Sequence, residues 1–197
     1  MTSTRSDADA IHASCTEPET FSEIFERHYD AIFQYLARRT RHGAAEDLTC
    51  DVFTVAFDIR DRFDLTSPSA RPWLYGIAHR VLMRHYRVAE RSDRAMRRMH
   101  IEHVTPDMAE EIVVRLDLQN VSTRFASAIE TITPLDREPL LMSVCERLSY
   151  NEISEALQVP VGTVRSRIAR ARAELRELLG HNGQQAGAPT AREGAKK

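Results

Sequence analysis

Three observations predict an all-helical fold in two small domains. Glycine is scarce, at seven of 197 residues, and long runs rich in Ala, Leu, Arg and Glu separate the Gly and Pro positions, a composition typical of helices. Apolar residues recur at helical rather than alternating intervals along most of the chain. A polar, mainly acidic stretch at about residues 99–119 separates two such regions. We therefore expect two helical domains joined by a flexible acidic linker.

The first domain is expected to span residues 20–98. Residues 1–19 are polar, acidic and aperiodic, so we expect them to be disordered. Apolar positions then follow a helical period from Thr20 to His42-Gly43, and the glycine ends that helix. A second helix is expected from Ala44 to about Arg62.

A loop and a long third helix complete this domain. The loop, residues 63–72, contains Pro68 and Pro72 among serine and threonine, and each proline disfavours helix in the residue before it. Pro72 also suits the first turn of a helix that runs to about residue 98. At about 100° per residue, one face of this helix is apolar and a neighbouring face carries a tryptophan and a row of arginines. That second face consists of Trp73, Gly76, Arg80, Arg84, Arg87 and Arg91.

The second domain is expected to span residues 120–180, followed by a flexible tail, 181–197. A helix ends before Pro134, and Thr133 is placed to cap the helix that Pro134 begins. Ser149 and Glu152 have capping-box spacing, which predicts the start of a further short helix.

The stretch "LSYNEISEALQVPVGTVRSRIARARAEL" predicts a helix-turn-helix. Its second helix, expected to be capped by Thr163, has an apolar stripe from Val164 to Leu178 and an opposite face of small residues flanked by arginines. Small residues let a helix enter the major groove, while guanidinium groups reach base edges or phosphates. The candidate DNA contacts are Thr163, Arg165, Ser166, Arg167, Ala169, Arg170 and Arg172. The alternative is a solvated helix whose arginines pair with Glu174 and Glu177.

Local charge supports contact with a polyanion in two places. The formal net charge is only -2, yet eight arginines between Arg71 and Arg98 face just Glu90 and Asp93, and a second basic block lies in the helix-turn-helix. Two separated basic blocks in a nearly neutral chain favour nucleic-acid binding by both domains.

The sequence gives little support for a metal-binding, catalytic, secreted or membrane protein. The three cysteines, Cys15, Cys50 and Cys145, are scattered, which indicates reduced thiols in a cytoplasmic protein with neither zinc nor disulfide. We interpret Cys50 and Cys145 as buried thiols rather than a redox switch. The eight histidines show no metal-ligand spacing, so no catalytic site, metal or cofactor is expected. Signal-peptide and membrane-spanning segments are not expected either.

Two parts of the chain resemble one family. "AEDLTCDVFTVAF" and "RPWLYGIAHRVLMRHYR" resemble region two of the sigma-seventy family, and the helix-turn-helix resembles its region four. The order and short linker are similar to those of the extracytoplasmic-function group of bacterial RNA polymerase sigma factors. The resemblance covers about residues 21–98 and 120–180.

The resemblance implies a promoter-specificity subunit that binds core RNA polymerase and promoter DNA. The first motif then docks on the clamp helices of the beta-prime subunit, with Glu46, Asp47, Asp51 and Phe53 as candidate contacts, and region four meets the beta flap. It further implies regulation of a stress- or signal-responsive regulon, commonly through an anti-sigma factor.

The same resemblance assigns DNA roles to both domains. The helix-turn-helix reads the minus-thirty-five element, the loop at residues 63–72 captures a flipped base of the minus-ten element, and the face carrying Trp73, Arg80, Arg84, Arg87 and Arg91 holds the opened strand. Arg80 stands where relatives often carry Asn, and Trp73 is also suited to a core position. The alternative function is a stand-alone helix-turn-helix regulator, although such proteins usually carry a receiver or ligand-binding domain upstream.

Overall fold

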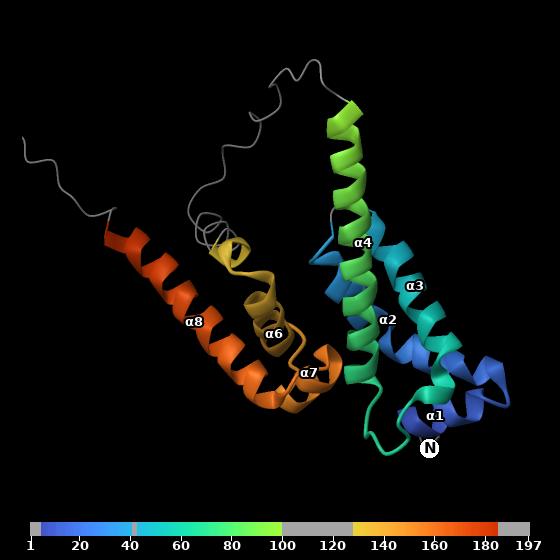
Figure 1. Cartoon of the computed structure of the whole chain (residues 1–197). Helices are drawn as coiled ribbons and strands as arrows, with labels where there is room; N and C mark the ends of the chain where they lie inside the picture. The colour runs from blue at the N-terminus through green and yellow to red at the C-terminus, as the bar shows by residue number, and fades with distance from the viewer. Residues whose placement is uncertain (1–4, 41–42, 100–127, 185–197) are drawn as a thin grey trace, which may run out of the picture.

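Helices form all the regular structure in the part of the chain described by the computed structural model, residues 5–40, 43–99 and 128–184 (Figure 1). The predicted all-helical fold is therefore confirmed. The linker expected at residues 99–119 lies, apart from Met99, outside the described residues, as does most of the predicted tail.

The first domain is built against one long helix, α4 (Arg71–Met99). Its other elements are α1 (Asp7–Ser14), η1 (Pro18–Phe21), α2 (Ser22–Ala37), α3 (Ala44–Asp58) and η2 (Arg60–Arg62). Gly43, in the left-handed conformation with φ of 80°, is the N-cap residue of α3. Both α2 and α3 pack against α4, as Figure 1 shows on one side of that helix.

The prediction of disorder for residues 1–19 is wrong for α1 and η1. An eight-residue helix is marginal alone, but α1 buries Ala10 and Ile11 completely against the rest of the first domain. The Ser6 hydroxyl caps α1 by accepting a hydrogen bond from the Asp9 amide at 3.1 Å. Tertiary burial therefore orders a segment whose composition indicated disorder.

The second domain has a helical segment at residues 128–131, followed by α6 (Pro134–Val144), α7 (Tyr150–Leu157) and α8 (Val161–Gln184). The capping box of Ser149 and Glu152 is present as predicted. Thr133 precedes α6 but its side chain makes no capping hydrogen bond. The tail prediction is wrong for residues 181–184, which continue α8.

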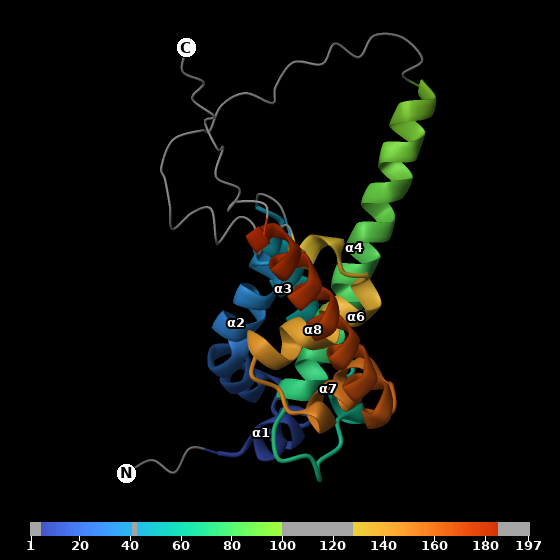
Figure 2. The same cartoon turned by 90° about the vertical axis from the view of Figure 1, so that its left-hand side faces the viewer.

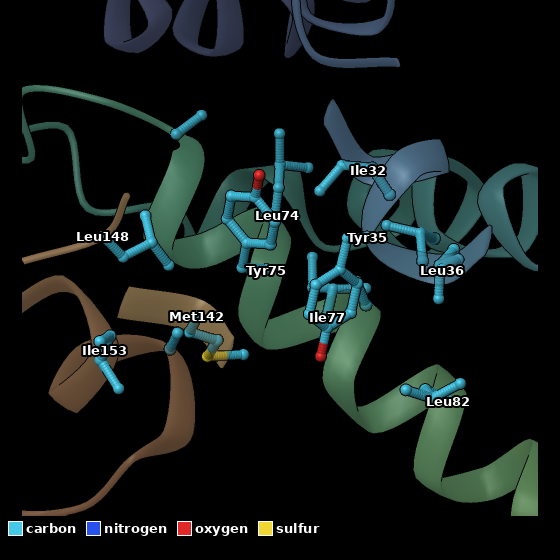
Figure 3. Close-up of a cluster of buried hydrophobic side chains, with 14 of the residues drawn as sticks. Ile32, Tyr35, Leu36, Leu74, Tyr75, Ile77, Leu82, Met142, Leu148 and Ile153 are labelled. Atoms are coloured by element: carbon cyan, nitrogen blue, oxygen red, sulfur yellow. The ribbon is translucent and has the colours of Figure 1, made fainter. Parts of the chain in front are cut away.

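The two domains share one core rather than lying apart. Ile32 and Tyr35 of α2 and Leu74 of α4 lie in the same buried cluster as Met142 and Ile153 of the second domain (Figure 3). Helix α7 packs directly on α4, while α8 packs on α6 and α7 and lies further out (Figures 1 and 2). The sequence indicated two domains but not this close association.

Gly76 allows a close approach between the backbones of the two domains. A Cβ atom at this position would lie 2.8 Å from the backbone oxygen of Ala156 in α7. Because Gly76 lacks a side chain, the backbones of α4 and α7 can meet here. The association thus depends on a residue of the same α4 face that carries Trp73 and the arginines.

Candidate nucleic-acid interface

The helix-turn-helix is formed by α7 and α8. Gln158 ends α7 in the left-handed conformation, with φ of 55°, and the Val159 carbonyl accepts a hydrogen bond from the Ser154 hydroxyl at 2.6 Å. The predicted apolar stripe of α8 faces inward, and Val164, Ile168 and Ala171 are buried. Helix α8 begins two residues before Thr163, so this residue lies inside the first turn and not at the cap.

The outer face of α8 is available for contact. Of the candidate DNA contacts, Thr163 and Arg167 are half-buried. The other five are exposed: Arg165, Ser166, Ala169, Arg170 and Arg172. The exposed strip therefore combines small side chains with guanidinium groups, as groove binding requires.

Arg170 already has a partner. Its guanidinium donates two hydrogen bonds to the Asp136 carboxylate of α6, at 2.8 and 3.0 Å. This pairing lowers the pKa of Asp136 below its ordinary value and keeps the carboxylate charged. Arg170 thus braces α8 against α6 in this structure, whereas Arg165 has an exposed side chain nearer the start of the helix.

The cationic face of α4 is open along most of its length. The side chains of Arg80, Arg84, Arg87 and Arg91 are exposed. Trp73 is half-buried and its ring packs edge-on against Phe63, with centroids 5.2 Å apart. Between Trp73 and Arg80, helix α7 covers this face at Gly76.

The loop between η2 and α4 is locally structured. The Asp64 carboxylate accepts hydrogen bonds from the Thr66 amide and hydroxyl, at 2.9 and 2.7 Å. These bonds lower the pKa of Asp64 and define an Asx turn. Leu65 and Pro68 are exposed on the loop, whereas Phe63 and Ala70 at its two ends are buried. The loop therefore has fixed ends and an exposed centre.

The candidate polymerase contacts on α3 divide into two groups. Glu46, Asp47 and Asp51 are exposed. Phe53 instead belongs to the core at 4% exposure, where its ring packs against Phe25 with centroids 4.9 Å apart. Phe53 is therefore withdrawn as a polymerase contact.

A buried ionic network, which the sequence did not predict, joins the two domains. Glu146, with a side chain only 4% exposed, accepts hydrogen bonds from Arg38 at 3.0 Å and Arg39 at 3.3 Å. Glu138 accepts from Arg39 at 3.2 Å and from the Tyr35 hydroxyl at 2.7 Å. Burial and the nearby Glu138 carboxylate raise the pKa of Tyr35 well above its ordinary value, so the phenol stays protonated as a donor.

The start of α4 also joins this network. The Arg71 side chain donates a hydrogen bond to the Glu146 backbone oxygen at 2.7 Å. Tyr75 donates to the Glu146 carboxylate at 3.4 Å. These two pairs are 75 and 71 residues apart in the sequence, so sequence spacing gives no signal for them.

The cysteine interpretation is wrong in one respect, since Cys15, Cys50 and Cys145 are all exposed. Cys50 lies on α3, whose inner face is formed by Leu48, Val52 and Ala56. Its helical position therefore directs it away from that core. Among the described helices, none combines the length and apolarity needed to cross a bilayer.

His79 lies in the cleft between the domains, with Leu157 of α7 and Glu138 of α6. Its Nδ1 atom is buried without a hydrogen-bond partner among the described residues. Burial lowers the pKa of His79, Arg39 and Arg80 lower it further, and Glu138 opposes them. His79 is therefore neutral in the closed structure.

Acidification is expected to loosen the association of the domains through His79. Because the pKa is lowered in the closed structure, the open or unfolded chain binds the proton more readily. The closed arrangement of the domains therefore has its full stability above about pH 6.5, the ordinary pKa of histidine. It loses stability as the pH falls below that value. The radius of gyration from small-angle scattering should rise between pH 7.5 and 5.5, and H79Q should reduce this rise. H85Q, on the same helix, is the control; an equal rise in H79Q would exclude His79 as the cause.

An all-helical chain with a helix-turn-helix, a second arginine-bearing helix and an acidic helical surface has the features of a transcription factor. Two family models match it: "Sigma-70 region 2" over residues 24–92 and "Sigma-70, region 4" over residues 122–175. The "Probable RNA polymerase sigma-C factor" of Mycobacterium bovis is 32% identical over 177 residues, which cover 87% of this chain and 92% of the relative. The "RNA polymerase sigma factor CarQ" of Myxococcus xanthus is 31% identical over 82% of this chain and 90% of its own length.

Solved structures share the fold. CnrH in complex with the cytosolic domain of CnrY has a TM-score of 0.63 at 24% identity, covering 89% of this chain and 99% of that one. The sigma factor RpoE in complex with the anti-sigma factor NepR from Bartonella quintana has a TM-score of 0.58 at 23% identity, covering 81% and 96%. The chain belongs to the sigma-70 family, in its extracytoplasmic-function group, and is an RNA polymerase sigma factor rather than a stand-alone regulator.

Proposed function

We propose that this sigma factor directs core RNA polymerase to promoters by reading the minus-thirty-five element with α8 and holding the opened minus-ten strand with α4. The observation that carries this proposal is the presence of two exposed arginine surfaces on two different domains. The protein has no catalytic chemistry of its own in this proposal, since polymerase performs the reaction. It acts in the cytoplasm, on a regulon that responds to stress or another signal.

In region four, the first turns of α8 read base edges. Of the exposed candidates, Arg165 and Ser166 lie nearest the start of the helix, where recognition helices contact bases. Arg172 and Arg176 are exposed further along and suit phosphate contacts. Arg170 can read a base only after its hydrogen bonds to Asp136 break. We therefore assign it mainly to holding α8 against α6.

In region two, the exposed arginines of α4 neutralise phosphates of the separated strand. Trp73 is half-buried at the end of this row, which suits a residue that supports the loop and presents one ring edge to a base. The centre of the loop, where Leu65, Thr66 and Pro68 are exposed, captures the flipped base.

Promoter binding requires the domains to separate. The elements centred at minus thirty-five and minus ten are about 25 base pairs apart, or roughly 85 Å of duplex at 10–10.5 base pairs per 34–36 Å turn. Here α7 rests on α4 at Gly76, so the two DNA surfaces belong to one compact body. Core polymerase supplies the surfaces that hold the domains apart.

Two kinds of protein partner follow from this proposal. Glu46, Asp47 and Asp51 form the exposed acidic surface of α3 that meets the beta-prime clamp helices of polymerase, and region four meets the beta flap. An anti-sigma factor is the second partner. The similarity in fold to RpoE, which was solved with the anti-sigma factor NepR, supports this assignment.

The proposal is tested by transcription with purified core polymerase and templates from the source genome. We expect a promoter-specific transcript that depends on this protein. R165A should change base preference in the minus-thirty-five element by about 1–3 kcal/mol. R176A should weaken binding similarly for all sequences and reduce its salt dependence. The absence of any specific transcript would overturn the proposed function, and equal effects of both variants on all sequences would overturn the assignment of Arg165.

A further inference from the structure

Asp7 is a buried carboxylate in a helix that lies outside the region 2 match, which begins at residue 24. Only 7% of Asp7 is exposed, although most Asp residues lie at the surface. Burying a charge is costly unless it is paired and hydrogen-bonded. The partners of Asp7 therefore indicate what its burial stabilises.

The Asp7 carboxylate connects three elements of the first domain. One oxygen, Oδ1, accepts a hydrogen bond from Arg27 of α2. The other, Oδ2, lies 3.0 Å from His28 Nε2 and accepts a bond from the Ala70 amide at 2.8 Å. The Ser69 hydroxyl also donates to Oδ2, at 3.3 Å. Burial raises the pKa of Asp7, but the bonds from His28, Ala70 and Arg27 outweigh it and hold the pKa far below its ordinary value, so the carboxylate is charged.

Two of these partners belong to the loop before α4. The Ser69 hydroxyl, which donates to Asp7, accepts a hydrogen bond from the Arg71 amide at 3.2 Å. The Ala70 carbonyl accepts the first bond of α4, from the Leu74 amide at 2.9 Å. Asp7 therefore fixes the point where the loop ends and α4 begins, three residues before Trp73.

Helix α1 also contacts η2, which precedes the loop. The backbone oxygen of Ser14, at the end of α1, accepts a hydrogen bond from Arg60 Nε of η2 at 3.1 Å. In Figure 1 the loop runs beside α1 at the bottom of the view. One short helix thus contacts both η2 and the last residues of the loop.

We propose that Asp7 is a positioning residue for minus-ten recognition, which acts by fixing the return of the base-capturing loop into α4. The inference rests on the proposed function, because that function assigns base capture to the loop. A loop that selects a base must keep its shape before the base arrives, and small displacements in such sites reduce discrimination strongly. Asp7 provides this rigidity from outside the loop, and it touches no DNA.

The test compares holoenzymes on two pools of templates, one randomised in the minus-ten element and the other in the minus-thirty-five element. Core polymerase with the wild-type protein, D7N, D7A or S69A transcribes each pool, and the transcribed templates are sequenced. We expect base preference in the minus-ten pool to fall by about tenfold in D7A, with a smaller fall in D7N. Selection from the minus-thirty-five pool should be unchanged.

D9N is the matched control, because Asp9 lies on the same helix, is exposed, and has the Ser6 hydroxyl as its side-chain partner. S69A removes the bonds of the Ser69 hydroxyl to Asp7 and Arg71 but leaves Asp7 bonded to Arg27, His28 and the Ala70 amide, so it tests the inference even if D7A fails to fold. Unchanged minus-ten selection in folded D7N and S69A would overturn the inference, as would an equal loss of selection in both pools. A wild-type holoenzyme that selects nothing from either pool would overturn the proposed function and the inference with it.

Discussion

Replacing Glu146 by glutamine is expected to separate the two domains while each keeps its fold. Glu146 faces Arg38 and Arg39 across the domain interface, and the Arg39 side chain is only 6% exposed. Removing one charge of a buried pair costs up to about 3–5 kcal/mol while its partner stays buried, and the cost is lower here because Arg39 keeps Glu138 as a second partner at 3.2 Å. Separation of the domains returns Arg39 to water and avoids this cost. The closed arrangement can bear this cost only if it is more stable than the open one by a larger amount. We therefore expect E146Q to open.

Small-angle scattering and thermal unfolding together test this expectation. The radius of gyration of E146Q should exceed that of the wild type at pH 7.5, and its circular dichroism should remain helical. E155Q is the control on α7. Burial raises the pKa of Glu155, and the charges of Asp64 and Glu152 raise it further, so removing the Glu155 charge relieves repulsion across the interface. E155Q should stay as compact as the wild type. A compact E146Q would show that the ionic network does not hold the domains together.

The fold was largely predictable because helical periodicity is a local property. The start of α4 and the capping box of α7 depend on residues close in sequence, and both are present where expected. Helix α1 was missed because Ala10 and Ile11 are buried only when α1 packs against η1, α2 and η2 in the folded domain. The Ser6–Asp9 cap was a local signal for it, but composition alone indicated disorder.

The sequence predicted which side chains of α8 are exposed, but not which residues of other helices they contact. Helical phase correctly separated the buried Val164 and Ile168 from the exposed Arg165. The same reasoning cannot show that Arg170 pairs with Asp136, because α6 and α8 meet only in the folded domain. Phe53 was misassigned for a related reason, since an aromatic residue in a docking motif fits a core position equally well.

Gly76→Ala is expected to have opposite effects on helix α4 and on the domain interface. Alanine in place of an interior helical glycine favours the helix by about 1 kcal/mol. The new Cβ would lie 2.8 Å from the Ala156 backbone oxygen, whereas even close carbon–oxygen contacts are roughly 3.3 Å long. A backbone atom cannot rotate away as a side chain can, so α7 must move off α4. Overpacking of this kind costs about 1–3 kcal/mol.

Opening by G76A should be visible in the same scattering measurement, with the first domain at least as heat-stable as in the wild type. G162A is the matched control, because Gly162 lies in α8 and a Cβ there would meet nothing within 4 Å. It should gain helix stability and leave the radius of gyration unchanged. If G76A is as compact as G162A, the backbone approach at Gly76 does not determine closure. If G76A opens, the glycine in the arginine-bearing face of α4 controls whether that face is covered by α7 or available to a DNA strand.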